Sequence, residues 1–265
     1  MLVGFGGGFM VDAHGTTLIQ DPPGLYGVRS VFELPVHAVL LDAGGVLLLP
    51  DPSAMRRALS ELGVTPDDDT CRRAHYASTR EIDRLGEVDW VAADRVAARV
   101  LGVPDERVED ALAPISSVYL SDSWVPVTGA THALLALQRA GMPLAVVSNA
   151  GGTMEHQLLS HRICAVDPSG APTGDDFAEV AVVVDSHVVG IEKPDPRIFE
   201  IALAKLGVGS ANAVYVGDTV HFDVVGARAA GLAPVHVDPY ELCPDDDHPH
   251  IASLADLVPH LVPAS

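Results

Sequence analysis

Short apolar runs and helically spaced apolar residues alternate along the chain and predict its elements. The run 37–41 is almost continuously apolar and stops at Asp42 and a pair of glycines. A strand that is buried on both faces of a parallel sheet has this pattern, and a tight turn ends it. We therefore expect a central strand at 37–41.

The next part of the chain, from residue 53 to about 120, carries helical spacing and no strand-like run. Apolar residues recur three and four positions apart in four segments: 55–62, 68–85, 88–101 and 106–120. Glycines separate these segments and prolines follow two of the breaks, which is how helices end. Residues 53–125 are therefore expected to form a helical domain inserted directly after the first strand.

After residue 126 strands and helices alternate. The expected strands are 143–147, 180–184, 213–216 and 234–237, and the expected helices are 129–140, 153–161, 196–206 and 223–230, with a weaker strand and helix within 250–261. Such alternation predicts an α/β fold, a doubly wound (Rossmann-like) parallel sheet with helices on both faces. Its core would consist of residues 36–52 and 126–265.

The first 35 residues form a separate N-terminal arm in this interpretation. Glycines at 4, 6, 7 and 8 lie close together, but no strand precedes them and no helical pattern follows, so a phosphate-binding loop is not expected. An irregular arm or a hairpin lying on the core fits better. No Lys or Arg precedes the apolar stretch, so we do not interpret it as a secretion signal.

Composition excludes several classes of protein. The 265 residues are 48% hydrophobic, enough for a packed core, and carry a formal charge of −20, which disfavours binding to nucleic acid or to an anionic membrane. No apolar run approaches the roughly 18–20 residues of a membrane span. Cys71, Cys164 and Cys243 are far apart and in no C-x-x-C pair, so a disulfide framework or thiolate zinc site is not expected and a reducing, cytoplasmic location is.

Polar residues stand at four of the expected strand ends: Asp42, Ser148 with Asn149, Lys193, and Asp218 with Asp223. One such residue is explained by helix capping alone. Four in sequence order, each at the carboxyl end of a strand, indicate a site, because ligands bind at this edge of an open parallel sheet.

The charges of these residues indicate the chemistry of the site. Asp42, Asp218 and Asp223 would converge, and neighbouring carboxylates repel one another and raise their pKa values. A Mg²⁺ ion bound by oxygen ligands relieves that repulsion. A nucleophilic carboxylate flanked by a metal and by Lys193 suits phosphoryl transfer through an aspartyl-phosphate.

The four motifs, L-L-D-A-G-G, V-S-N, E-K-P-D-P and G-D-T-V-H-F-D, resemble those of the haloacid dehalogenase (HAD) superfamily, most of whose members are phosphatases. The resemblance covers about residues 36–261, and the helical block is similar to the family's α-helical cap. The resemblance implies that Asp42 is the nucleophile and that Ser148 and Asn149 hold the phosphoryl group. It also implies that Lys193 neutralises the charge of that group. Asp218 would bind Mg²⁺, with Asp223 in a supporting role.

Gly44 departs from the family pattern. Phosphatases of the family usually carry a second Asp two residues after the nucleophile, which protonates the leaving oxygen and later activates water. A glycine does neither, although its main-chain carbonyl remains as a metal ligand. Either a cap residue or His221 supplies the proton, or the substrate has a leaving group that needs little help.

We therefore expect a hydrolase, a Mg²⁺-dependent phosphoric monoester hydrolase (EC 3.1.3) acting on a small phosphorylated metabolite, with no nucleic-acid or membrane partner. Two alternatives remain open. One is a catalytically weak, ligand-binding or regulatory protein. The other is a dehalogenase-type hydrolase, which attacks carbon without a metal and has little need of both Asp218 and Asp223.

Further residues receive more limited predictions. His75, Tyr76 and Arg80 on the second cap helix are candidates to touch substrate. Hinges for cap movement are expected near 50–52 and 124–128. The segment 244–250 contains Asp and His residues, but its two prolines and irregular spacing favour a surface loop over a metal site.

Overall fold

The computed structural model describes residues 9–11, 17–19, 35–166 and 178–262. Strands β1 (Phe9–Val11) and β2 (Thr17–Ile19) pair antiparallel, so part of the N-terminal arm forms a hairpin-like pair. The glycines at 4–8 lie outside the described residues.

Within the described residues the central sheet is parallel and six-stranded, in the order β12-β11-β10-β3-β6-β9. Its strands are β3 (Ala38–Leu41), β6 (Leu144–Ser148), β9 (Val183–Asp185), β10 (Ala213–Gly217), β11 (Ala233–Val237) and β12 (His250–Ile251). From β3 the chain first adds β6 and β9 on one side and then crosses over to add β10, β11 and β12 on the other. This is the doubly wound topology predicted from the sequence, with its switch point between β3 and β10.

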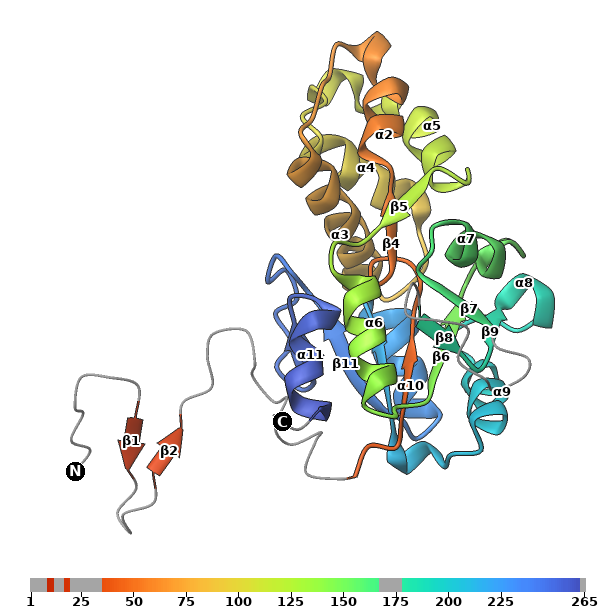
Figure 1. Cartoon of the computed structure of the whole chain (residues 1–265). Coiled ribbons are helices and arrows are strands. Elements are labelled where there is room, and N and C mark those ends of the chain that lie inside the picture. The colour runs from red at the N-terminus through yellow and green to blue at the C-terminus, as the bar shows by residue number, and fades with distance from the viewer. Residues whose placement is uncertain (1–8, 12–16, 20–34, 167–177, 263–265) are drawn as a thin grey trace.

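Helices cover both faces of the sheet (Figure 1). Val39 and Leu41 of β3 belong to a core shared with α6 (Ala130–Arg139), α7 (Met154–Ser160) and α11 (Leu254–Leu261). Ala38 and Leu40 point the other way, into a core shared with α9 (Pro196–Leu206) and α10 (Val225–Ala229). Because both faces of β3 are buried, the strand is apolar at every position.

A separate group of helices stands at one end of this core (Figure 1). It comprises α2 (Pro52–Ala58), a 3₁₀ turn at Ser60–Leu62, α3 (Asp68–Leu85), α4 (Trp90–Val100), a 3₁₀ turn at Asp105–Arg107 and α5 (Val108–Tyr119). These helices enclose a hydrophobic cluster of their own, with Leu59, Ala97 and Ile115 at its centre.

Two short strands connect this helical group to the sheet. Strand β4 (Leu48–Pro50) pairs antiparallel with β5 (Trp124–Pro126), so the chain enters and leaves the helical group side by side. This ribbon was not predicted from the sequence, because three-residue strands are too short to show a period. Its strands end where hinges were expected.

One predicted strand, 180–184, is wrong as a single element. The chain forms β8 (Ala178–Val180), paired in parallel with β7 (Cys164–Val166), and then the separate strand β9, followed by the short helix α8 (Ser186–Val189). The break occurs because the main-chain N–H of Ala181 donates to Leu144 of the central sheet, which moves the chain from one sheet to the other.

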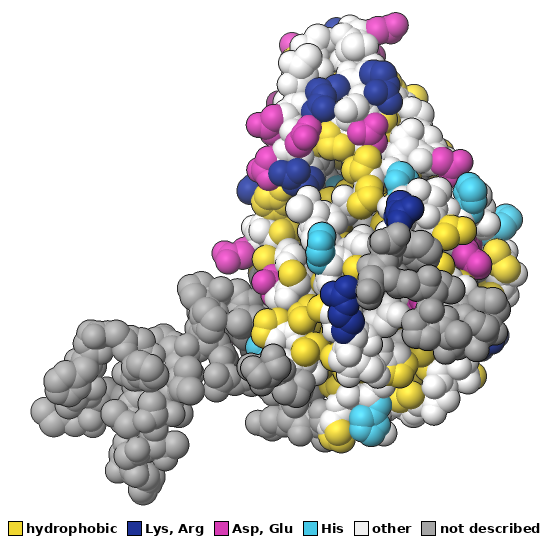
Figure 2. Space-filling view, in the orientation of Figure 1, with side chains coloured by type: hydrophobic (Ala, Val, Ile, Leu, Met, Phe, Trp, Pro, Cys, Tyr) yellow, Lys and Arg dark blue, Asp and Glu magenta, His cyan; other side chains and the backbone are white. Residues whose placement is uncertain are grey.

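Charges of both signs are interspersed over the helical group on the face seen in Figure 2. Exposed ion pairs in the helical group include Arg95–Glu109, at 2.7 Å. Among the described residues, none of the helices combines the length and the apolar character needed to cross a membrane.

Candidate active site

The predicted site residues converge where β3 and β10 lie side by side. Asp42 directly follows β3 and Asp218 directly follows β10, and both are buried. One carboxylate oxygen from each of Asp42, Asp218 and Asp223 lies within 4.8 Å of the others. The sheet topology brings these residues together although up to 181 positions separate them in the sequence.

Asp42 is one of two carboxylates in direct contact with the buried Lys193. Its Oδ2 lies 2.9 Å from Lys193 Nζ, and its Oδ1 accepts a hydrogen bond of 2.7 Å from the main-chain N–H of Ala43. Burial raises the pKa of Asp42 to about 7; Lys193 opposes that shift, while the charges of Asp223 and Asp218 add to it. A group held so far from its ordinary pKa by burial and like charges is typical of a functional site.

Lys193 is positioned by Asn149. The Asn149 side chain accepts from the Lys193 main-chain N–H at 2.8 Å and donates to the Lys193 carbonyl at 3.0 Å. Both polar groups of the Asn149 amide are therefore engaged by the loop that carries the lysine. The resemblance implied that Asn149 helps to hold a phosphoryl group, and that role stays a prediction.

Lys193 is fully charged despite its burial. Burial lowers the pKa of Lys193, but Asp223 and Asp42 raise it by more, so it lies above its ordinary value. Its Nζ donates to Asp223 Oδ1 at 2.8 Å and to the Tyr215 hydroxyl at 3.0 Å.

Asp223 is saturated with hydrogen bonds. In addition to Lys193, it accepts from the Tyr215 hydroxyl at 3.0 Å and from the Thr219 N–H and hydroxyl at 3.0 and 2.7 Å. Burial raises its pKa, but Lys193 and these donors lower it by more, so Asp223 remains ionised. These contacts stabilise the π-helical turn at Val220–Val224, because the turn directs the Asp223 carboxylate back toward Thr219.

Tyr215 was missed by the sequence analysis. It lies within β10, in the apolar run V-Y-V, so its pattern is that of an ordinary core residue. Its hydroxyl also lies 3.1 Å from the carbonyl of Val147, so it ties the lysine and Asp223 to the end of β6.

Asp218 contacts the helical group directly. Its Oδ2 lies 3.1 Å from Nε2 of His75 on α3, while the other ring nitrogen of His75 is buried with no hydrogen-bond partner among the described residues. The Asp218 carboxylate also packs closely against Gly45: a Cβ on Gly45 would lie 2.3 Å from it, and φ is +66° there. Any larger residue at 45 would displace Asp218.

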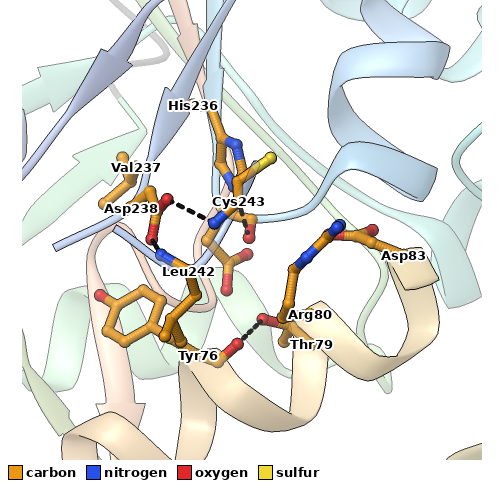
Figure 3. A pocket seen from close by; sticks show the side chains of 10 residues that line it. Tyr76, Thr79, Arg80, Asp83, His236, Val237, Asp238, Leu242 and Cys243 are labelled. Carbon is orange, nitrogen blue, oxygen red and sulfur yellow. Dashed lines mark hydrogen bonds and ion pairs between the residues drawn. The ribbon is translucent and has the colours of Figure 1, made fainter. Parts of the chain in front are cut away.

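The other two cap candidates lie nearby. Tyr76 donates a hydrogen bond of 2.6 Å to the carbonyl of Gly45, and Arg80 lies 4.0 Å from Asp83 on its own helix. Together with Asp218 and the end of β11 they line a cavity of about 10 Å³ (Figure 3). A space of this size holds about one water, so α3 covers this side of the site.

The remaining predicted residues are placed as follows. Ser148 is buried at the carboxyl end of β6. Gly44 lies in the turn after Asp42, and a Cβ there would meet nothing closer than Trp124, at 3.9 Å. His221 is half-buried, and its ring lies edge-on to Phe222. The main-chain N–H of His221 donates a hydrogen bond of 2.7 Å to the Asp83 carboxylate.

The chain is similar in sequence to several known enzymes. It is 31% identical over 219 residues to ribulose-1,5-bisphosphate 5-phosphatase of Halopiger xanaduensis, covering 77% of this chain and 85% of that protein. It is 33% identical over 174 residues to haloacid dehalogenase-like hydrolase domain-containing protein 3 of mouse. That match covers 63% of this chain and 62% of the mouse protein. It is 38% identical over 101 residues to phosphoserine phosphatase of Thermus thermophilus, covering 38% and 36%, so it spans about a third of that enzyme.

Solved structures share the fold. A dehalogenase crystal structure with an intermediate complex superposes with a TM-score of 0.55 at 21% identity, over 87% of this chain and 98% of that one. A magnesium-bound HAD hydrolase of Bacillus subtilis gives 0.53 at 15% identity, over 86% and 99%. The family model described as haloacid dehalogenase-like hydrolase matches residues 36–231. The resemblance inferred from the four motifs is thereby confirmed: the chain belongs to the haloacid dehalogenase-like hydrolases.

Proposed function

We propose that this hydrolase is a Mg²⁺-dependent phosphatase that cleaves small phosphorylated metabolites through an aspartyl-phosphate on Asp42. The observation that carries the proposal is the contact between Asp42 Oδ2 and the buried Lys193 Nζ, at 2.9 Å, beside the Asp218 carboxylate. A nucleophilic carboxylate and a fixed cation facing one space suit a reaction in which negative charge moves onto phosphoryl oxygens.

Asp42 acts as the nucleophile in the proposed reaction. One oxygen of the ionised carboxylate bonds to phosphorus as the bond from phosphorus to the ester oxygen breaks, and the leaving oxygen takes up a proton. A water then attacks the same phosphorus, the bond to Asp42 breaks, and phosphate leaves. Lys193 neutralises charge on the phosphoryl oxygens throughout. The hydrogen bond from the Ala43 N–H to Oδ1 keeps the carboxylate oriented.

The carboxylates fit a hard divalent cation. Three of them lie within reach of one another in a buried cleft, where burial and, to a smaller extent, the charges of Asp223 and Asp218 raise the pKa of Asp42. Asp42, Asp218 and the main-chain carbonyl of Gly44 would hold Mg²⁺, with Asp223 supporting through Lys193, since both oxygens of Asp223 already have donors. When bound, the ion would withdraw charge from the phosphoryl oxygens.

Ser148 and Asn149 are assigned different parts in phosphoryl binding. Ser148 would donate its hydroxyl to a phosphoryl oxygen from the end of β6. Asn149 would act through Lys193, because its side chain fixes the main chain on both sides of that residue. Asn149 is therefore a positioning residue in this proposal.

Residues 53–125 are proposed to act as a mobile cap, with residues 36–52 and 126–265 as the catalytic core. The helical group has its own hydrophobic cluster, and a narrow two-stranded ribbon joins it to the sheet. Two of its contacts with the site, His75 with Asp218 and Tyr76 with Gly45, are hydrogen bonds that water can replace. Because Asp42 and Lys193 are buried and α3 lies against the neighbouring Asp218, substrate entry would require this cap to open.

The substrate class follows from the enclosure and from the relatives. A site at the base of a cap admits a small molecule that the cap can close over. The relatives named above include phosphatases of a sugar bisphosphate and of a phosphorylated amino acid. We therefore propose a phosphorylated metabolite, handled in the cytoplasm, as the substrate.

The test is phosphate release from a panel of sugar phosphates, phosphorylated amino acids and acyl phosphates, with Mg²⁺ or with a chelator. Asp42→Asn is compared with the matched control Asp110→Asn, an exposed carboxylate on α5. The proposal predicts turnover that requires Mg²⁺, is lost in Asp42→Asn and is kept in Asp110→Asn.

Gly44 favours one second candidate, a ligand-binding protein with residual catalysis. That candidate predicts that phosphorylated metabolites bind with no more than slow turnover, even when the leaving group is good. Rapid turnover of an acyl or aryl phosphate that depends on Asp42 would exclude it.

A further inference from the structure

Three histidines and a cysteine meet at the edge of the sheet, on the opposite side of Asp218 from Asp42 in the strand order. We call His236, Cys243, His248 and His250 the His/Cys cluster; one ligand atom from each lies within 4.8 Å of all the others. His236 is on β11, His250 begins β12, and the loop between these strands supplies the other two. The sequence analysis interpreted 244–250 as a surface loop, but His248 is only 3% exposed.

The outer hydrogen bonds of two of these rings fix their tautomers. His236 Nε2 lies 3.2 Å from the main-chain carbonyl of Asp218, and His248 Nδ1 lies 2.6 Å from a carboxylate oxygen of Asp247. Both partners only accept hydrogen bonds, so each of these ring nitrogens carries the proton. The other nitrogens, His236 Nδ1 and His248 Nε2, then face each other at 3.0 Å with lone pairs.

Two lone pairs at that distance repel unless a proton or a metal cation lies between them. The other members point to the same space. His250 Nε2 is buried and makes no hydrogen bond among the described residues, while its Nδ1 lies 3.5 Å from Asp238. Cys243 Sγ lies 4.0 Å from His248 Nε2, and Figure 3 shows the sulfur beside the His236 ring.

The donor set suits a borderline-soft cation. Imidazole nitrogen and thiolate sulfur are the usual ligands of tetrahedral zinc, whose nitrogen ligands lie about 3.3 Å apart at bond lengths of about 2.0–2.1 Å. Carbonyl and carboxylate partners on the outer ring nitrogens are typical of metal-bound histidines. Partial burial raises the pKa of Cys243, but the neighbouring imidazoles lower it to about 5, so the thiolate is accessible.

We propose that the His/Cys cluster binds one Zn²⁺ in a closed site with four protein ligands. With no position left for water or substrate, this zinc is structural. It holds the loop 238–249 onto β11 and β12, and through His236 Nε2 it restrains the main chain of Asp218. The proposal concerns a site distinct from the carboxylate cluster and does not depend on the phosphatase assignment.

The first test is the metal content of untagged protein, produced with zinc present and dialysed against a weak chelator. We expect one zinc per chain in the wild type and loss of it in Cys243→Ser and His248→Ala. Cys71→Ala and His156→Ala, which alter residues outside the cluster, are matched controls and should keep it. Equal zinc content in the wild type and both cluster variants would overturn the proposal.

The second test uses Co²⁺ in place of zinc on the metal-free wild type. Binding at the His/Cys cluster produces a sulfur-to-cobalt charge-transfer band, which the all-oxygen Asp cluster does not produce. The band should saturate at one equivalent of Co²⁺, disappear when zinc is added and be absent in Cys243→Ser. If the variants fail to fold, the wild-type titration decides alone: a protein that binds Co²⁺ without this band contradicts the site.

Discussion

Replacing Gly44 with aspartate should restore the general acid that the turn after Asp42 lacks. The structure has room for it: Gly44 does not adopt a left-handed conformation, and an added Cβ would meet only Trp124, at an ordinary contact distance of 3.9 Å. The substitution therefore changes the chemistry of the site more than its shape.

The expected size of the effect follows from the surroundings. General acid catalysis contributes about 10²–10⁴-fold, which is about 3–5 kcal/mol of barrier. The new carboxyl would lie near Asp42 and Asp218, and these like charges would favour its protonated form. We expect alkyl phosphates to gain at least about tenfold in kcat/KM, and acyl and aryl phosphates to gain little.

The assay is a series of substituted phenyl and alkyl phosphates, with log kcat/KM plotted against the pKa of the leaving group. Wild-type protein should give a steep line and Gly44→Asp a flatter one. Gly44→Asn is the matched control, since the amide has the shape of the acid but supplies no proton at neutral pH. A flat line for the wild type, or the same line for Gly44→Asp and Gly44→Asn, would show that another group, such as His75 or His221, already delivers the proton.

Three further results are expected. Asp42→Asn should abolish phosphate release while its circular dichroism stays that of the wild type, and substantial residual turnover would contradict its role. In calorimetric titrations, Asp218→Asn should bind Mg²⁺ more weakly than wild type and Asp110→Asn; equal affinities would refute the proposed ligand. The pKa of Asp42 is about 7 in the folded, metal-free protein against 3.8 as the ordinary value, so between these values the folded state holds a proton that the unfolded chain lacks. Asp42 therefore makes the free energy of unfolding fall as the pH rises from 3.8 to about 7. Urea denaturation at several pH values should show a smaller fall for metal-free Asp42→Asn than for the metal-free wild type. Equal falls in the two proteins would contradict the buried, protonated carboxyl.

Elements with local determinants were predictable from the sequence. Helix α3 has the bounds expected, because Asp67 caps its first turn and Gly86 ends it with a φ of +68°. Helix α9 likewise begins at Pro196 after the capping Asp195 and ends at Gly207. The doubly wound class of the sheet was also predictable, since it is the usual outcome of such alternation.

Contacts that depend on tertiary structure were not predictable. The contact of the Asn149 side chain with the main chain of Lys193, 44 residues away, was not predictable because nothing local shows it. Tyr215 looked like a core residue because its hydroxyl partners come from other elements. The His/Cys cluster has no regular ligand spacing, because the pairing of β11 with β12, which sets His236 opposite His250, creates it.

The central claim is that Asp42 carries the phosphoryl group during turnover, and chemical trapping tests it most directly. The wild-type protein is mixed with Mg²⁺ and an acyl or aryl phosphate, quenched within the first turnover in denaturant and reduced with borohydride, which converts an aspartyl-phosphate to homoserine. Mass spectrometry of the peptide that contains residue 42 should find homoserine at that position, and no conversion when substrate is omitted or in Asp42→Asn. Phosphate release in the first turnover with homoserine at another carboxylate, or with none at all, would contradict the account.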